Sequence, residues 1–312
     1  MIPMTICPPC LTGAQTTSYN CANGSWQHGT LDIQIIAGVA PNAYIDYEQV
    51  VDYLGSSNSN YVKTGLDNVV AFKLAEPERQ ATGYSPTLVA VNMSLALDPT
   101  TQWSTTCPSI PIASELTQLI SMGVVPVIAA GNNSWTNGVN SPACFPGVLS
   151  VGATYDSSTV YTGCGTNTHQ ADTVACFSNR SLNYPAVYAP GVNIGATPVY
   201  VNNLPQSGTS MAAPHVAGEV AILRAAPGGQ SPSVSSLITT IETSGTPVND
   251  GTGSGTNKKR VDISMALTNL KPTITAYKMQ IVPSTLSLYV GGPYYGLSVA
   301  CIDVSGNAEA CP

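Results

Sequence analysis

The chain has 312 residues, of which 43% are hydrophobic and only 9% are charged, and its formal net charge is −7. This hydrophobic content is enough to bury a large core, so the sequence is that of a globular protein rather than a disordered one. The acidic balance argues against nucleic acids and anionic membranes as partners, and no run of 18 apolar residues predicts a membrane span.

The N-terminal segment, residues 1–27, is rich in cysteine and has no recognisable signal peptide. Either a mature N-terminus is shown or an upstream part is missing. Nine cysteines in a chain with few charges favour an oxidising compartment and disulfides. Local spacing suggests the pairs Cys164 with Cys176 and Cys301 with Cys311, and Cys107 and Cys144 flank one helix-strand unit that a bond between them would close. Cys7, Cys10 and Cys21 remain, and we interpret CPPC as structural rather than redox-active because no βαβ unit surrounds it.

From about residue 33 the sequence alternates apolar runs with helix-length segments, which is typical of an α/β fold with a parallel sheet and helices on both faces. Near-continuous apolar runs at 89–97, 124–131 and 147–155 predict buried parallel strands. Between the first two, residues 112–123 have helical spacing and end at a glycine suited to a C-cap. The sequence therefore predicts a strand-helix-strand crossover.

Two more helices are predicted at 211–225 and 233–245, and the pattern changes near residue 271. Beyond that point apolar and polar residues alternate between Gly and Pro turns, which is typical of β structure. We therefore divide the chain into an N-terminal segment (1–27) that is expected to be truncated, a main domain (28–270), and a short all-β segment (271–312). The last is too short for a full sandwich and is weakly similar to the opening strands of an immunoglobulin-like module.

Ser210 lies in SGTSMAAPHVAG, residues 207–218, at the start of a predicted helix. A backbone amide and the helix dipole favour negative charge there, although a plain N-cap serine is the simpler interpretation. Pro214 is expected in the first turn, where its missing N–H has no intrahelical acceptor. The stretch GTSMAAPHVAG resembles the serine motif of the subtilisin-like serine peptidases, the subtilase family. The resemblance implies that Ser210 is the nucleophile, within a three-layer α/β/α sandwich that has a mainly parallel, seven-stranded sheet and here lacks its first strand.

The sequence contains three histidines that are candidate bases. His215 belongs to the serine motif and is expected to point away from Ser210, and His169 lies in a polar loop and is expected to be exposed. His28 opens HGTLDIQIIAGVAPNA, which resembles the histidine motif of the family and the Gly-Val-Ala-Pro stretch after it. The resemblance implies that His28 is the general base, and the alternative is a capping or packing histidine.

Asn132 ends VVPVIAAGN, which resembles the strand-Gly-Asn motif of the family. The resemblance implies that its side-chain NH₂ stabilises the oxyanion together with the Ser210 N–H, whereas a plain turn residue is the alternative. VNMSLAL resembles the edge strand that pairs with extended substrate. By the same resemblance, the substrate-binding residues are Ser94, Leu95 and Ala96 on one side of the S1 pocket and Ala129, Ala130 and Gly131 on the other. A local alignment places Asn140 near the floor of this pocket.

The orienting aspartate of the family stands on the first strand, but residues 1–27 contain no aspartate. One explanation is that this strand is missing from the chain. The other is Asp32, four residues after His28, since i,i+4 spacing on a helix places two side chains about 5 to 6 Å apart. A structural Asp32 is an equal alternative. Without an orienting carboxylate the rate falls about 10⁴-fold, so the chain would then be weakly active or inactive.

These resemblances, which cover about residues 28–268, predict a secreted serine endopeptidase that acts on polypeptides as a monomer. The resemblance implies no required cofactor and is compatible with structural calcium at unplaced ligands. Two alternatives stay open. One is a non-catalytic relative that serves as a binding module. The other is an acid peptidase of the sedolisin type, because LDIQIIAGVAPNA also resembles the sedolisins. In that family a Glu and an Asp at i,i+4 spacing are the catalytic residues.

Overall fold

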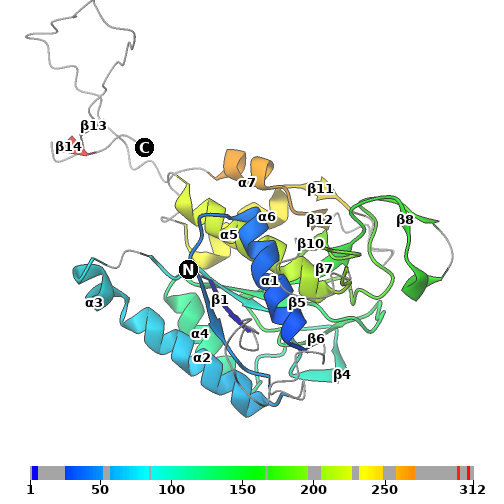
Figure 1. The fold of residues 1–312 in the computed structure, drawn as a ribbon, viewed down its shortest axis with the longest axis horizontal. Coiled ribbons are helices and arrows are strands. Elements are labelled where there is room, and N and C mark those ends of the chain that lie inside the picture. Colours follow the sequence, from blue (N-terminus) through cyan, green and yellow to red (C-terminus); the bar gives the residue numbers. More distant parts are fainter. Residues whose placement is uncertain are drawn as a thin grey trace, which may run out of the picture.

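The computed structural model describes residues 2–5, 25–51, 57–83, 86–165, 168–195, 205–226, 232–248, 258–270, 301–302 and 308–309. Its centre is an eight-stranded sheet in the order β11-β12-β10-β7-β5-β3-β1-β2 (Figure 1). The strands are β1 (Ile2–Thr5), β2 (Ile45–Glu48), β3 (Ala90–Met93), β5 (Val125–Ala129), β7 (Leu149–Thr154), β10 (Val187–Pro190), β11 (Thr246–Pro247) and β12 (Lys259–Arg260). Only β11 and β12 pair antiparallel within this sheet, which confirms the predicted, mainly parallel α/β fold.

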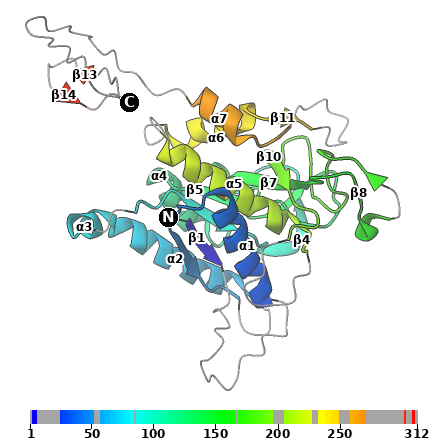
Figure 2. The ribbon, with the colours of Figure 1, turned by 45° about the horizontal axis from the view of Figure 1, so that its top comes forward.

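Helices cover both faces of the sheet (Figures 1 and 2). One face packs against α1 (Ser25–Val39), α5 (Thr209–Ala225), α6 (Val234–Thr243) and α7 (Ile263–Asn269). The other face packs against α2 (Ser59–Leu74) and α4 (Ala113–Ser121), and α3 (Glu76–Ala81) follows α2. Smaller elements are the pairs β4 (Asp98–Trp103) with β6 (Val139–Ser141), β8 (Thr159–Val160) with β9 (Thr168–His169), and β13 (Cys301–Ile302) with β14 (Ala308–Glu309), and a 3₁₀ turn at Thr162–Cys164. None of the helices in the described ranges is long and apolar enough to cross a membrane.

Strand β5 shows why a continuous apolar run predicts a central strand. Val127 and Ala129 face the core beneath α1 and α5, whereas Ile128 and Ala130 face the core beneath α2 and α4. Successive side chains of a strand point to opposite faces, so a strand that is covered on both faces must be apolar throughout. The described strands β3, β5 and β7 all lie inside the predicted runs, and α4 ends just before Gly123, whose φ is +82°.

The expectation that the first strand is missing from the sheet is wrong. Residues of the N-terminal segment form β1, which inserts between β2 and β3 and pairs in parallel with both. Ile2 is paired with Ile45, and Met4 is paired with Asn92. The strand contains no aspartate, so Asp32 remains the candidate carboxylate among the described residues.

Two of the predicted disulfides are present. Cys107 is bonded to Cys144, and Cys164 is bonded to Cys176. Cys7, Cys10, Cys21 and Cys311 lie outside the described residues, and with them the predicted Cys301 pair. Of residues 271–312 the structure describes only the short antiparallel pair β13 and β14, so most of the predicted β segment also lies outside the described residues.

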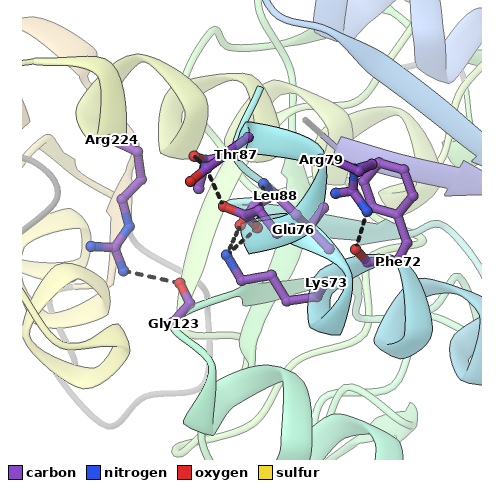
Figure 3. A network of polar contacts seen from close by, with 9 residues as sticks. Phe72, Lys73, Glu76, Arg79, Thr87, Leu88, Gly123 and Arg224 are labelled. Atoms are coloured by element: carbon purple, nitrogen blue, oxygen red, sulfur yellow. Dashed lines mark hydrogen bonds and ion pairs between the residues drawn. The ribbon is translucent and has the colours of Figure 1, made fainter. Parts of the chain in front are cut away.

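Buried charges hold the amino ends of β3 and β5 (Figure 3). Lys73 Nζ lies 2.6 Å from the Glu76 carboxylate and also donates to the Leu88 carbonyl, just before β3. Arg224 Nη2 donates to the Gly123 carbonyl at 3.2 Å, just before β5. Each of these two cations therefore has protein acceptors at the amino ends of the strands.

Candidate active site

The predicted site residues lie together beyond the carboxyl ends of β3 and β5. Ser94 follows β3, Asn132 follows β5, and Ser210 is in the first turn of α5. The Ser94 hydroxyl donates to the Ser210 carbonyl at 2.8 Å, and the Ser210 hydroxyl donates to the Ser94 carbonyl at 3.4 Å. The Asn132 Oδ1 accepts from the amide and the hydroxyl of Thr209 at 2.8 and 2.9 Å. In open α/β sheets this edge is the usual location of a ligand site.

Pro214 is in the second turn of α5, so the expectation that it lies in the first turn is wrong. In a regular helix its N–H would bond to the carbonyl of Ser210, four residues earlier. Because Pro214 has no N–H, that carbonyl needs another donor, and the Ser94 hydroxyl supplies it. The proline therefore allows the end of β3 to bind the main chain of Ser210 directly.

His28 and Ser210 are carried by α1 and α5, which pack side by side (Figure 2). Met211, directly after Ser210, packs against Leu31 and Ile35 of α1. This contact holds α1 against α5 close to Ser210. No hydrogen bond joins His28 to Ser210 within the described part of the chain, and the Ser210 hydroxyl is directed to Ser94 instead.

Asp32 is fully buried one turn after His28, as the i,i+4 spacing predicts. Its Oδ2 lies 3.8 Å from His28 Nδ1, an ion-pair distance that is too long for a hydrogen bond. Burial raises the pKa of Asp32 well above its ordinary value, and the nearby Ser94 hydroxyl counteracts part of this rise. Burial lowers the pKa of His28. Uptake of a proton by His28 beside an ionised Asp32 would form an ion pair in which the carboxylate is fully buried and the imidazole is 39% exposed.

Asn132 is held so that its amide nitrogen is left for a ligand. Both contacts of its side chain with Thr209 use Oδ1, and the side chain is exposed. The Thr209 hydroxyl also accepts from the Gly131 N–H at 3.0 Å, which ties the end of β5 to the start of α5. A Cβ on Gly208 would lie 3.2 Å from Asn132 Nδ2, so glycine keeps the space beside this donor open. The arrangement presents an N–H donor next to the N-terminus of a helix.

The proposed substrate-binding residues lie on two neighbouring main-chain segments. β3 and β5 are parallel neighbours, and Met93 is paired with Ile128 at their ends. The segments Ser94–Ala96 and Ala129–Gly131, the second of which begins with the last residue of β5, therefore lie at the same edge of the sheet. Ser94 and the two alanines of the second segment are buried, and Leu95 and Ala96 are partly exposed.

Sequence reasoning missed two polar residues that support the site. Thr209 links Asn132 to Gly131, and the buried Asn92 donates to the Ser94 hydroxyl at 3.0 Å. Asn92 is an amide inside an otherwise apolar strand. Because a buried polar group requires a hydrogen-bond partner, this amide in the sequence could have indicated that Asn92 contacts another polar residue of the site.

The other two histidines lie away from these contacts. His215 Nδ1 bonds to the Met211 carbonyl at 2.8 Å, within its own helix. The expectation that His169 is exposed is wrong, because its ring is half-buried and stacks on Tyr155 with centroids 4.3 Å apart. In the ranges that the structure describes, no cluster of three or more His, Cys, Asp or Glu side chains could hold a metal ion, so the structure gives the expected calcium no such cluster.

Comparison with known proteins gives consistent matches. The chain is 31% identical over 206 residues to the alkaline serine protease ver112 of Corniculantispora psalliotae, an alignment that covers 66% of this chain and 46% of that protein. It is 29% identical over 191 residues to subtilisin E of Bacillus subtilis, with 60% and 40% covered. The chain thus spans about half, or less, of the length of these curated relatives.

Solved structures agree on the fold. The patellamide maturation protease PatA matches with a TM-score of 0.60 at 21% identity, covering 86% of this chain and 96% of that one. A cold-adapted subtilisin-like serine proteinase matches with a TM-score of 0.52 at 25% identity, with 75% and 72% covered. The model of the subtilase family matches residues 13–260. The chain therefore belongs to the subtilase family.

Proposed function

We propose that the protein is a serine endopeptidase in which Ser210 is the nucleophile, His28 the general base and Asn132 the oxyanion donor. The observation that carries this proposal is the convergence of Ser94, Asn132 and Ser210 at the N-terminus of α5 through short hydrogen bonds. Family membership supports the same reaction, and the names of the relatives describe serine proteases.

In this reaction the Ser210 hydroxyl attacks the carbonyl carbon of a peptide bond while His28 takes its proton. The Ser210 hydroxyl, which donates to the Ser94 carbonyl in the structure, must first turn toward His28 for this transfer. The oxyanion that forms then accepts from Asn132 Nδ2 and from the N–H of Ser210. His28 returns the proton to the leaving amine, and water releases the acyl group by the same steps.

We further propose that Asp32 is the positioning carboxylate for His28. Its placement on the same helix, its complete burial and the 3.8 Å separation from His28 Nδ1 support this role. No hydrogen bond satisfies either oxygen of Asp32 among the described residues, so both are available to His28. A small movement of the imidazole ring would shorten the separation to a hydrogen bond when the ring becomes charged.

Peptide substrates would bind as an added strand between Ser94–Ala96 and Ala129–Gly131. Disulfides persist in oxidising compartments, so the pairs Cys107 with Cys144 and Cys164 with Cys176 support secretion. We retain the boundary at residue 270 and a monomer as parts of the proposal, whereas β1 joins the N-terminal segment to the sheet of the main domain.

A fluorophosphonate probe tests the proposal, because such a probe reacts only with an activated serine. We expect one adduct, mapped by peptide mass spectrometry to Ser210, and none in Ser210→Ala or in heat-denatured protein. Ser121→Ala, a change at an exposed serine on α4, should label like the wild type. A folded wild-type chain that forms no adduct at Ser210 would make the proposed activity untenable.

A further inference from the structure

The segments Ser94–Ala96 and Ala129–Gly131 diverge beyond the sheet, and β6 lies between them. On one side the Asn140 N–H donates to the Ala130 carbonyl at 3.0 Å, and on the other the Leu97 N–H donates to the Ser141 carbonyl at 2.8 Å. β6 therefore closes the bottom of the space between the two segments, where the side chain of the residue before the cleaved bond (P1) would enter.

The Asn140 side chain lies between the two segments and contacts residues on both sides. Asn140 is only 2% exposed, and its Nδ2 donates to the Asp98 carbonyl at 3.3 Å, just beyond Leu97. On the opposite side, a Cβ on Gly131 would lie 1.8 Å from Asn140 Oδ1. The amide group of Asn140 thus reaches from the Asp98 carbonyl, just beyond the first segment, to the main chain of Gly131 in the second segment.

A second asparagine prevents the Asn140 amide from moving aside. Asn179 is fully buried, and its Nδ2 donates to Asn140 Oδ1 at 3.0 Å. Its own Oδ1 accepts from the N–H groups of Asn133 and Trp135 at 2.8 and 3.2 Å. Since the amide that fixes Asn140 is itself fixed by main-chain donors, rotation of Asn140 would leave buried polar groups without partners.

From these contacts we infer that Asn140 restricts the protein to substrates with a small P1 side chain, such as alanine, serine or glycine. The inference rests on the proposed function, because it names the substrate class for the same site. A buried, hydrogen-bonded amide is a rigid floor, so a benzyl or long aliphatic side chain would have to displace it. Such displacement costs both packing and hydrogen bonds.

The test compares two peptide substrates that differ only at P1, alanine and phenylalanine, in the full chain. For the wild type we expect kcat/KM for the alanine peptide to be at least about tenfold higher than kcat/KM for the phenylalanine peptide. This is the scale on which a pocket discriminates side-chain size. Asn140→Gly should lower this alanine-to-phenylalanine ratio at least about tenfold by raising kcat/KM for phenylalanine. Asn183→Gly, the same change at an exposed position, should leave the ratio unchanged.

Labelling of Ser210 by the small fluorophosphonate separates the two proposals. If the wild type is not labelled, the proposed function fails and the inference fails with it. If wild type and variant are labelled equally but the ratio stays the same, the inference alone is wrong. If Asn140→Gly does not fold, Asn140→Ala serves as the second variant, because alanine removes the amide but keeps a Cβ in strand β6. The same decrease of the alanine-to-phenylalanine ratio is expected.

Discussion

The two ends of the central sheet use polar residues in opposite ways. At the amino ends of β3 and β5, Lys73, Glu76 and Arg224 are paired with carboxylate or carbonyl oxygens of the protein. At the carboxyl ends, both oxygens of Asp32 and the Oδ1 of Asn92 are buried without a hydrogen bond among the described residues. Unsatisfied buried groups cost stability, so they persist where another requirement, such as binding or catalysis, maintains them.

The largest expected effect is a fall in kcat when Asp32, at the carboxyl ends of the strands, is changed. Asp32→Asn keeps the shape of the side chain but removes the charge that would hold His28 in the correct tautomer. We expect kcat to fall by about 10⁴-fold while the fold is retained. Peptide hydrolysis and the rate of fluorophosphonate labelling measure this, and Asp67→Asn on the exposed face of α2 is the matched control. A rate equal to that of the wild type would rule out Asp32 as the positioning carboxylate.

The next effect concerns Asn132. Asn132→Ala removes the amide donor, so we expect kcat to fall by about 10²- to 10³-fold, the magnitude known for such donors in subtilisin-type enzymes. KM should change little, because the donor acts on the oxyanion rather than on the bound peptide. Steady-state kinetics separates the two constants, and Asn137→Ala, at an exposed position of the same loop, should change neither. A change confined to KM would contradict this role.

At the amino end, the expected effect is on stability alone. Glu76→Gln leaves the Lys73 side chain, which is only 14% exposed, without its carboxylate, so the free energy of unfolding should fall by about 3 kcal/mol. Denaturant titration measures this loss, while kcat/KM of the folded protein should stay unchanged. Asp67→Asn removes the exposed carboxylate beside Lys63 and should cost less than about 1 kcal/mol. Loss of activity in folded Glu76→Gln would mean that the two ends are not functionally distinct.

The smallest effect is a shift of the pH profile. The base must be neutral to accept a proton, and burial lowers the pKa of His28, so kcat/KM should hold as the pH falls to 6.5. Below the lowered pKa it should fall about tenfold per pH unit. In Asp32→Asn the fall should begin at a still lower pH, because a nearby negative charge favours the charged imidazole. Full activity maintained down to pH 4 would instead favour a carboxyl base, as in the sedolisin alternative.

Parts of the fold and site could be predicted from sequence because their signals are local. An apolar run such as 124–131 must be covered on both faces, and the i,i+4 spacing of His28 and Asp32 follows from helix geometry alone. The position of β1 could not be predicted in this way, since it depends on pairing with β2 and β3, far along the chain. The stacking of His169 on Tyr155 likewise depends on tertiary packing.

The break at Pro214 has a mechanical consequence. In an uninterrupted helix the main chain of Ser210 would be stabilised from within α5 and would be insensitive to its neighbours. Here one of its hydrogen bonds comes from Ser94, on the segment along which we propose that the peptide aligns. Any shift of that segment on substrate entry would be transmitted to the main chain of the proposed nucleophile through this 2.8 Å hydrogen bond and to its hydroxyl through the 3.4 Å one. Under the proposed function, binding of a peptide along this segment and alignment of Ser210 would then occur together.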